Sequence, residues 1–262
     1  MDAGQNTIKP QADYRQSMQA AELSGERAKC VTGIDGLDGI LGGGIPISNM
    51  VLVTGGSGTG KTTLAVEFLL RGASKGEKGL LISTFESPDK LISNIPHFDF
   101  FDEKYLKDGT LQILELGPLL DKAGIKQRIL DEESAIRLAE MIEKTLVENG
   151  VKRFVLDSLS SLLYGIEDQM VAKVLLQRLS AAIYAGRCTG LLISDKAGPS
   201  DIEGFVSDGI ISMDNHERRG DLLRTIQVTK MKGTSHSRSK YVIDLTSCGV
   251  LVTPLLKGGG VS

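Results

Sequence analysis

The chain has 262 residues, of which 41% are hydrophobic and 24% are charged, and its formal net charge is −3. This composition is typical of a folded globular protein and excludes a disordered or fibrous chain. No apolar run approaches the roughly 18 residues of a transmembrane helix, and the polar start lacks the apolar stretch of a secretory signal, so we expect a cytoplasmic protein without a membrane partner.

The charge is distributed unevenly along the chain. Between His216 and Lys240, seven basic and two acidic residues give a local charge of +5, so the rest of the chain carries −8 of the total of −3. The seven basic residues are Arg218, Arg219, Arg224, Lys230, Lys232, Arg238 and Lys240. A basic segment on an acidic body indicates local phosphate binding rather than a protein devoted to coating nucleic acid.

The domain organisation follows from changes in composition. We expect residues 1–29 to form a flexible tail with a short helix over residues 17–23, and residues 255–262 to form a second, Gly-rich flexible tail. Residues 30–254 are expected to form one domain.

The predicted elements of this domain begin with a strand, a loop and a helix. An apolar run predicts a buried strand at residues 50–54, and apolar residues at helical spacing predict a helix over residues 61–73. The same reasoning predicts further strands at 79–84, 110–114, 153–157 and 189–194, and further helices at 87–95, 132–148 and 168–185. This alternation predicts an α/β fold with a mostly parallel sheet and helices on both faces.

The pattern changes near residue 209. Short alternating runs at residues 210–213, 223–230, 240–244 and 250–252 predict antiparallel hairpins at the edge of the sheet.

A phosphate-binding motif lies between the first predicted strand and helix. Gly55, Gly56, Ser57, Gly58, Thr59, Gly60, Lys61 and Thr62 match G-x-x-x-x-G-K-[ST], and Thr63 follows directly. The glycines let successive backbone N–H groups turn toward a phosphate, Lys61 reaches the β- and γ-phosphates, and Thr62 offers its hydroxyl to Mg²⁺. The motif predicts a P-loop nucleotide site.

Two carboxylates are expected at the same edge of the sheet. Asp157 ends an apolar strand, as does the Mg²⁺-positioning residue of P-loop enzymes, although many strands end in a capping Asp. Glu86 follows the strand at residues 79–84 and can orient or deprotonate an attacking water. Its alternative role is to cap the next helix, which Ser87 could do equally well.

The basic segment contains Lys230 and Lys232 two positions apart on a predicted strand. Both side chains then point to one side and can converge on one anionic target. Charge pattern alone supports equally a solvated edge strand protected by lysines.

Several segments together resemble a single KaiC-type ATPase domain of the RecA superfamily, over about residues 30–254. The segments are residues 31–41, Gly42-Gly-Gly-Ile-Pro46, 55–62, Ser83-Thr-Phe-Glu86, Val155-Leu-Asp-Ser158, Phe205-Val-Ser-Asp208 and 224–236. The most specific among them is the ending Lys-Met-Lys-Gly-Thr-Ser-His at residues 230–236, because the phosphate loop alone fits any P-loop protein.

The resemblance implies a RecA-like core that assembles into a homo-oligomeric ring, usually a hexamer, with ATP at the subunit interfaces. By match to the family motif, the residues that would contact the nucleotide of the neighbouring subunit are Lys230, Met231, Lys232, Thr234 and His236. A cation inserted from a partner would offset charge on the transferring γ-phosphate, as an arginine finger does.

The chain departs from the family pattern in three places. Ser87 stands where a second glutamate is usual, and Lys232 replaces an arginine, so we expect slow hydrolysis. Gly204 and Phe205 replace the hydroxyl residues that some members phosphorylate, so autokinase activity is not expected.

These observations predict a Mg²⁺-dependent ATP-binding and ATP-hydrolysing protein with a role in signalling or regulation. Two alternatives stay open. One is a recombinase-like DNA-dependent ATPase, which the acidic Asp195–Glu203 loop disfavours because a strand-binding loop would be basic. The other is a nucleotide-gated scaffold that binds ATP and signals to a protein partner without hydrolysis.

Overall fold

The computed structural model describes residues 27–94, 98–125, 129–218 and 221–255. The helix expected over residues 17–23 and most of both expected tails lie outside these ranges. Across the described residues, no helix combines the length and the apolar character that crossing a membrane requires.

The molecule is built on a nine-stranded sheet with the order β11-β10-β9-β8-β3-β7-β6-β4-β5. Its strands are β3 (Met50–Thr54), β4 (Gly79–Ser83), β5 (Leu111–Glu115), β6 (Arg153–Asp157), β7 (Thr189–Ser194), β8 (Gly209–Arg218), β9 (Asp221–Met231), β10 (Lys240–Thr246) and β11 (Gly249–Pro254). The pairs from β8 through β3 to β5 are parallel, whereas β8–β9, β9–β10 and β10–β11 are antiparallel. The predicted α/β fold with C-terminal hairpins is confirmed.

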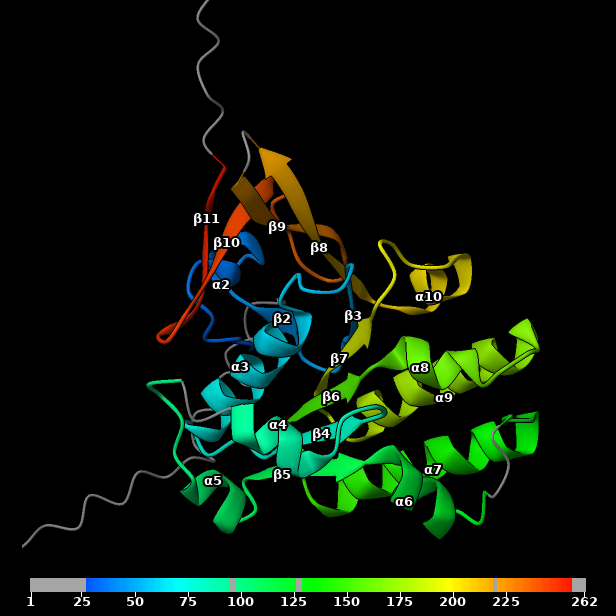
Figure 1. Ribbon diagram of the computed structural model, residues 1–262. Helices are drawn as coiled ribbons and strands as arrows, with labels where there is room; N and C mark the ends of the chain where they lie inside the picture. Colours follow the sequence, from blue (N-terminus) through cyan, green and yellow to red (C-terminus); the bar gives the residue numbers. More distant parts are fainter. Residues whose placement is uncertain (1–26, 95–97, 126–128, 219–220, 256–262) are drawn as a thin grey trace, which may run out of the picture.

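The helices lie on both faces of this sheet (Figure 1). They are α2 (Leu37–Ile40), α3 (Lys61–Ala73), α4 (Pro88–Asn94), α5 (Lys104–Lys107), α6 (Leu116–Lys122), α7 (Glu132–Glu148), α8 (Leu159–Tyr164), α9 (Gln169–Ala185) and α10 (Asp201–Val206). A separate small sheet joins β1 (Lys29–Cys30) to β2 (Ile45–Pro46) in antiparallel pairing. The α3 helix packs on one face of the sheet, and α7 and α9 pack on the other.

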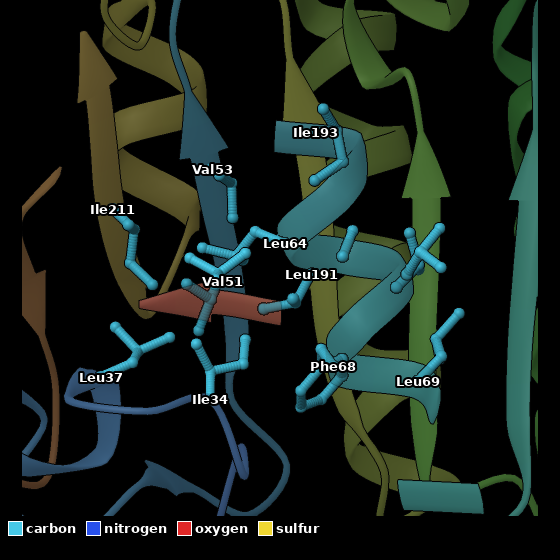
Figure 2. Packing of buried hydrophobic residues seen from close by; sticks show 14 of the residues in the cluster. Ile34, Leu37, Val51, Val53, Leu64, Phe68, Leu69, Leu191, Ile193 and Ile211 are labelled. Carbon is cyan, nitrogen blue, oxygen red and sulfur yellow. The ribbon is translucent and has the colours of Figure 1, made fainter. Parts of the chain in front are cut away.

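Alternation along the central strands produces two cores. Val51 and Val53 of β3 point toward α3, where they meet Leu64 and Phe68 in the first core (Figure 2). Met50 and Leu52 of the same strand belong to the second core, with α7 and α9. Successive side chains of a strand point to opposite faces, so a strand buried on both faces reads as a continuous apolar run. All five residues of β3 are buried accordingly.

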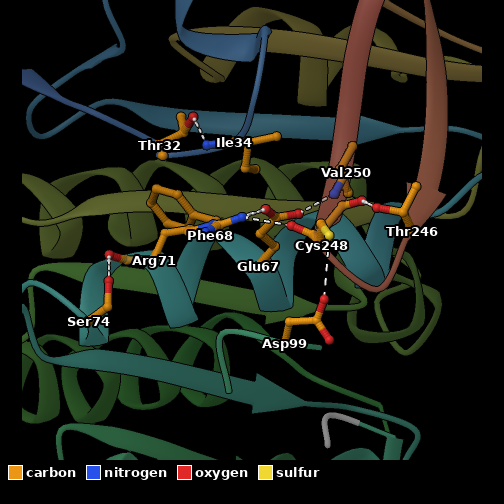
Figure 3. Close-up of polar contacts among 12 residues, drawn as sticks. Thr32, Ile34, Glu67, Phe68, Arg71, Ser74, Asp99, Thr246, Cys248 and Val250 are labelled. Carbon is orange, nitrogen blue, oxygen red and sulfur yellow. Dashed lines mark hydrogen bonds and ion pairs between the residues drawn. The ribbon is translucent and has the colours of Figure 1, made fainter. Parts of the chain in front are cut away.

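The helix that follows the phosphate loop is tied to the C-terminal hairpin. Glu67 of α3 is fully buried and accepts a 2.6 Å hydrogen bond from the amide of Val250, while Arg71 donates to Glu67 (2.9 Å) and to the carbonyl of Cys248 (2.9 Å). Figure 3 shows this cluster, in which Asp99 also accepts a hydrogen bond from the Cys248 thiol. Burial raises the pKa of Glu67, and its hydrogen bonds from Val250 and Arg71 oppose that rise. The contacts fix the orientation of α3 beneath the loop.

Candidate functional site

The loop from Gly55 to Gly60 connects β3 to α3, and its shape depends on glycine. Gly58 and Gly60 adopt φ values of 76° and 97°, in the left-handed region that favours glycine. A Cβ at Gly55 would lie 2.3 Å from the carbonyl oxygen of Met213, so a side chain does not fit there. Thr59 donates to the carbonyl of Gly56 (2.9 Å), and the amide of Gly55 donates to Lys196 (2.8 Å). The loop is therefore fixed by its own contacts and by the segment after β7.

Lys61 and Thr62 open α3 directly after this loop. The side chain of Lys61 is only 6% exposed, and its Nζ donates to the carbonyl of Gly56 (2.9 Å) and lies 3.1 Å from Oδ1 of Asp195. Thr62 Oγ1 donates to Oδ2 of Asp157 across 2.6 Å. The structure thus brings Lys61, Thr62 and Asp157 together, as the sequence predicted. Ser57 is exposed, and Thr63 is half-buried in the first turn of the helix.

Asp157 ends β6 and is mostly shielded from solvent. Burial raises the pKa of Asp157, the hydrogen bond from Thr62 opposes this, and the negative charge of Asp195 raises it further. A hydroxyl and a carboxylate that meet at 2.6 Å beside a phosphate loop are the oxygen donors that Mg²⁺ takes in P-loop proteins. Across the described residues, no group of three or more His, Cys, Asp or Glu side chains could hold a metal. The oxygens of Thr62 and Asp157 are of the donor type that suits a Mg²⁺ ion whose other ligands are phosphate and water.

Glu86 lies just beyond β4, at the same edge of the sheet. Its carboxylate forms an ion pair with Lys90 at 2.7 Å and is 32% exposed, and its amide donates to Ser83 (3.1 Å). Thr84 joins this segment to the end of β6, because its amide donates to the carbonyl of Asp157 (2.7 Å). Glu86 is close enough to Asp157 for its charge to raise the pKa of Asp157. Its position suits a group that acts on water near the phosphates, although Lys90 neutralises part of its charge.

Two further residues contact the loop and were not assigned to the site from the sequence. Asp195 directly follows β7, and the sequence analysis considered it only as part of an acidic loop. Arg224 of β9 donates from Nε to the carbonyl of Gly58 at 3.3 Å. The signal for Asp195 is its position after a strand that neighbours β3, but the strand order is needed to recognise it. Nothing in the local sequence separates Arg224 from the other basic residues around it.

Lys230 and Lys232 lie at the opposite edge of the sheet. Lys230 Nζ donates to the carbonyls of Gly204 (2.8 Å) and Ser207 (2.7 Å), and Lys232 Nζ lies 3.0 Å from Oδ1 of Asp208. Asp208 Oδ2 accepts from the amide of Met50, the first residue of β3, whereas the phosphate loop follows the last residue of β3. A five-residue strand spans roughly 16 Å. These lysines are therefore separated from the phosphate loop of their own chain.

The other residues of the predicted trans motif have mixed environments. The side chain of Met231 is 6% exposed and packs in the first core, so a nucleotide contact at this position would use the main chain. Thr234 donates to the carbonyl of Leu41 (3.4 Å), and Nδ1 of His236 lies 3.1 Å from the carbonyl oxygen of Ser237. Lys230 and Lys232 both line a hollow of about 630 Å³. Both lysines thus border the same hollow, and their convergence on one anionic target stays a prediction.

Comparisons with known proteins agree on one family. A family model described as "ATPase: KaiC" matches residues 30–257. A "UPF0273 protein" of Thermotoga maritima is 33% identical over 241 residues, covering 87% of this chain and 97% of its own length. The "Circadian clock oscillator protein KaiC" of Acaryochloris marina is 32% identical over 88% of this chain, which spans 45% of that protein. A solved "KaiC-like protein" of Pyrococcus horikoshii superimposes with a TM-score of 0.73 and 29% identity, over 86% of this chain and 99% of that chain.

Proposed function

The chain belongs to the KaiC family of ATPases, and from that premise we propose that it binds Mg²⁺-ATP, hydrolyses it slowly and works as a homo-oligomeric ring, most simply a hexamer, in signalling or regulation. A cytoplasmic location and the division at residues 30 and 254 belong to the same proposal. A KaiC-like RecA fold supports this proposal. Because the same fold occurs in proteins of unrelated function, the proposal rests on the residues of the site.

One observation carries the proposal: the phosphate loop brings the Lys61 ammonium, the Thr62 hydroxyl and the Asp157 carboxylate to one edge of the sheet. In such a site the loop amides and Lys61 hold the β- and γ-phosphates, and the N-terminus of the 13-residue helix α3 adds a partial positive charge. Mg²⁺ would be held by Thr62 and Asp157 and would offset phosphate charge. The chain's own residues then act by positioning and by electrostatics.

Glu86 is the proposed water-orienting carboxylate. It lies beside Asp157 at the edge where the γ-phosphate would be, and an ionised carboxylate can accept a proton from an attacking water. Its ion pair with Lys90 occupies one carboxylate oxygen, and Ser87 offers no second carboxylate. Both features support slow turnover.

Lys230 is the proposed cation for the neighbouring subunit. It is separated from its own phosphate loop by the length of β3, so it can meet a γ-phosphate only across an interface. Two of its three N–H groups are used by Gly204 and Ser207, which leaves one donor for a phosphate oxygen. The ring arrangement follows from this requirement, because each subunit completes the site of the next.

The test is nucleotide binding by isothermal titration calorimetry with Mg²⁺. Lys61→Ala should abolish tight binding of ATP and ADP, because the phosphates lose the buried ammonium that the loop provides. Lys75→Ala, which removes an exposed lysine just beyond α3, is the matched control and should bind as wild type. If Lys61→Ala retains wild-type affinity, the loop is not a nucleotide site. Light scattering on the same samples should show an oligomer with Mg²⁺-ATP, and a monomer would contradict the ring.

A further inference from the structure

The ion pair between Lys61 and Asp195 is the starting point. Lys61 Nζ lies 3.1 Å from Asp195 Oδ1, and the lysine side chain is 6% exposed whereas the aspartate is 55% exposed. The Asp195 amide donates to Oγ of Ser160 (2.7 Å), which fixes the backbone from which this carboxylate extends. A negatively charged group thus reaches the phosphate-binding ammonium from the solvent side.

A nucleotide phosphate would meet this carboxylate directly. The P-loop lysine binds the β- and γ-phosphates, so an anionic oxygen within 3.1 Å of Lys61 Nζ competes with them for the same N–H donors. Lys61 also donates to Gly56, which leaves it two N–H groups to share. A diphosphate needs one phosphate contact from Lys61 and can leave Asp195 in place, whereas a triphosphate brings a second anionic group to the position that Asp195 holds.

Asp195 is also attached to the segment that holds Lys230. The carbonyl of Lys196 accepts from Gly55 in the phosphate loop (2.8 Å), and Lys196 Nζ lies 3.9 Å from the buried carboxylate of Glu203. Glu203 and Ser200 form the capping box of α10, with the Ser200 amide donating to Glu203 Oε2 (2.6 Å).

The end of this segment carries the two carbonyls that fix Lys230. They belong to Gly204 and Ser207, and the Ser207 hydroxyl donates to the carbonyl of Glu203 (2.7 Å). Residues 195–207 therefore link the phosphate lysine of a subunit to the cation that this subunit would lend to its neighbour.

We propose that Asp195 distinguishes a nucleoside triphosphate from a diphosphate: the γ-phosphate displaces its carboxylate from Lys61, and this displacement loosens the 195–207 segment that holds Lys230. The inference rests on the proposed nucleotide site and adds a specificity to it. A ligand shifts a conformational equilibrium only through its different affinity for the two arrangements, and here the γ-phosphate supplies that difference. The subunit would then release Lys230 for its neighbour when its own site holds a triphosphate.

The first test is a ratio of affinities. Dissociation constants for Mg²⁺-ADP and for the Mg²⁺ complex of a non-hydrolysable imido analogue of ATP are measured by calorimetry for wild type, Asp195→Asn and Asp121→Asn. Asp195→Asn should tighten the binding of the triphosphate analogue by about tenfold and change that of ADP by less than about twofold, because the charge that it removes opposes only the γ-phosphate. Asp121→Asn removes the same charge from an exposed position on α6, outside the 195–207 segment, and should leave the ratio unchanged.

The second test is hydrogen exchange of residues 196–207 in wild type and Asp195→Asn. In wild type, exchange should be faster with the triphosphate analogue than with ADP, and in Asp195→Asn this difference should disappear. Equal changes for the two nucleotides, weaker triphosphate binding in Asp195→Asn, or exchange that does not depend on the nucleotide in wild type would overturn the inference. If wild type binds neither nucleotide, the proposed function itself fails; an unchanged ratio in a protein that binds both removes only the role of Asp195.

Discussion

Replacing Arg153 should test how β6, the strand that ends at Asp157, is held in the fold. Arg153 begins β6, its side chain is 0% exposed, and its Nε lies 2.6 Å from Oε2 of Glu77. Three of its four other N–H groups donate to the carbonyls of Val31 (2.8 Å), Thr32 (3.1 Å) and Phe68 (2.7 Å). One guanidinium therefore joins β6, α3 and the segment after β1, in a geometry that no other side chain can reproduce.

The expected loss of stability in Arg153→Met follows from the groups that this substitution leaves without partners. Three carbonyls each lose a hydrogen bond from a charged donor, and the Glu77 carboxylate, 25% exposed, loses its counter-charge. Removing one partner of a buried ion pair costs about 3–5 kcal/mol, so we expect the free energy of unfolding to fall by about that amount. For a chain of this size that corresponds to a decrease in Tm of roughly 6–20 °C.

Urea unfolding followed by circular dichroism measures this change, with two controls. Arg137→Met on the exposed face of α7 removes an arginine that is 44% exposed and lies 3.7 Å from Glu133, and it should change the stability by less than about 0.5 kcal/mol. Glu77→Gln keeps an acceptor for Arg153 but removes its counter-charge, so the loss of stability should lie between those of Arg137→Met and Arg153→Met. If Arg153→Met is as stable as Arg137→Met, the buried network around Arg153 does not stabilise β6 and the reasoning is refuted.

Four further outcomes are expected in hydrolysis assays at matched nucleotide occupancy. Glu86→Gln should bind ATP normally and release phosphate about 10²- to 10⁴-fold more slowly, and an unchanged rate would mean that another group activates the water. Ser87→Glu should raise the wild-type rate by restoring a second carboxylate, and a lower rate would show that its charge repels the nucleotide instead. Lys230→Ala should be inactive alone but regain activity when mixed with Lys61→Ala, because the mixed interface combines an intact phosphate loop with an intact Lys230. Burial, and then the charge of Lys232, lowers the pKa of Lys230, so the wild-type rate should decline at a less alkaline pH than in Lys230→Arg.

The long helices and the central strands could be predicted from the sequence, because each contains a full apolar run or a full set of apolar residues at helical spacing. The predicted bounds of β3, α3, α7, β6 and β7 are those of the structure. Among the helices of seven residues or fewer, α4 was expected at residues 87–95, whereas α2, α5, α6, α8 and α10 were not predicted. Helices this short depend more on tertiary contacts than on their own periodicity. The strands β8 and β9 extend well beyond their predicted apolar runs, because the antiparallel ladder continues through polar residues as far as Arg218 and Asp221.

In the candidate site, too, some contacts could be predicted from the sequence and others could not. The contact of Thr62 with Asp157 was predictable. The phosphate-binding motif places Thr62 just after the carboxyl end of one strand, and Asp157 ends another strand whose carboxyl end lies at the same edge of a parallel sheet. The contact of Lys61 with Asp195 was not predictable, because it requires β7 to be the neighbour of β3, and strand order is not encoded in any local run of residues. The sequence also could not show that Lys230 is held by Gly204 and Ser207, which are more than twenty residues away in the chain.

The two ends of β3 separate the phosphate loop from the lysines that we propose act on a neighbouring subunit. Its carboxyl end leads into the phosphate loop, and its amino end is joined to Asp208 and, through it, to Lys232. Because β3 is a rigid, fully buried strand, these two ends keep a fixed separation, and no rearrangement within the described part of the subunit would bring Lys232 to Lys61 without breaking the sheet. In the proposed ring, a nucleotide that contacts both would lie between two copies. The segment 195–207 runs from one end of the strand to the other, so in that ring it is the part of the fold through which the proposed switch would connect one interface to the next.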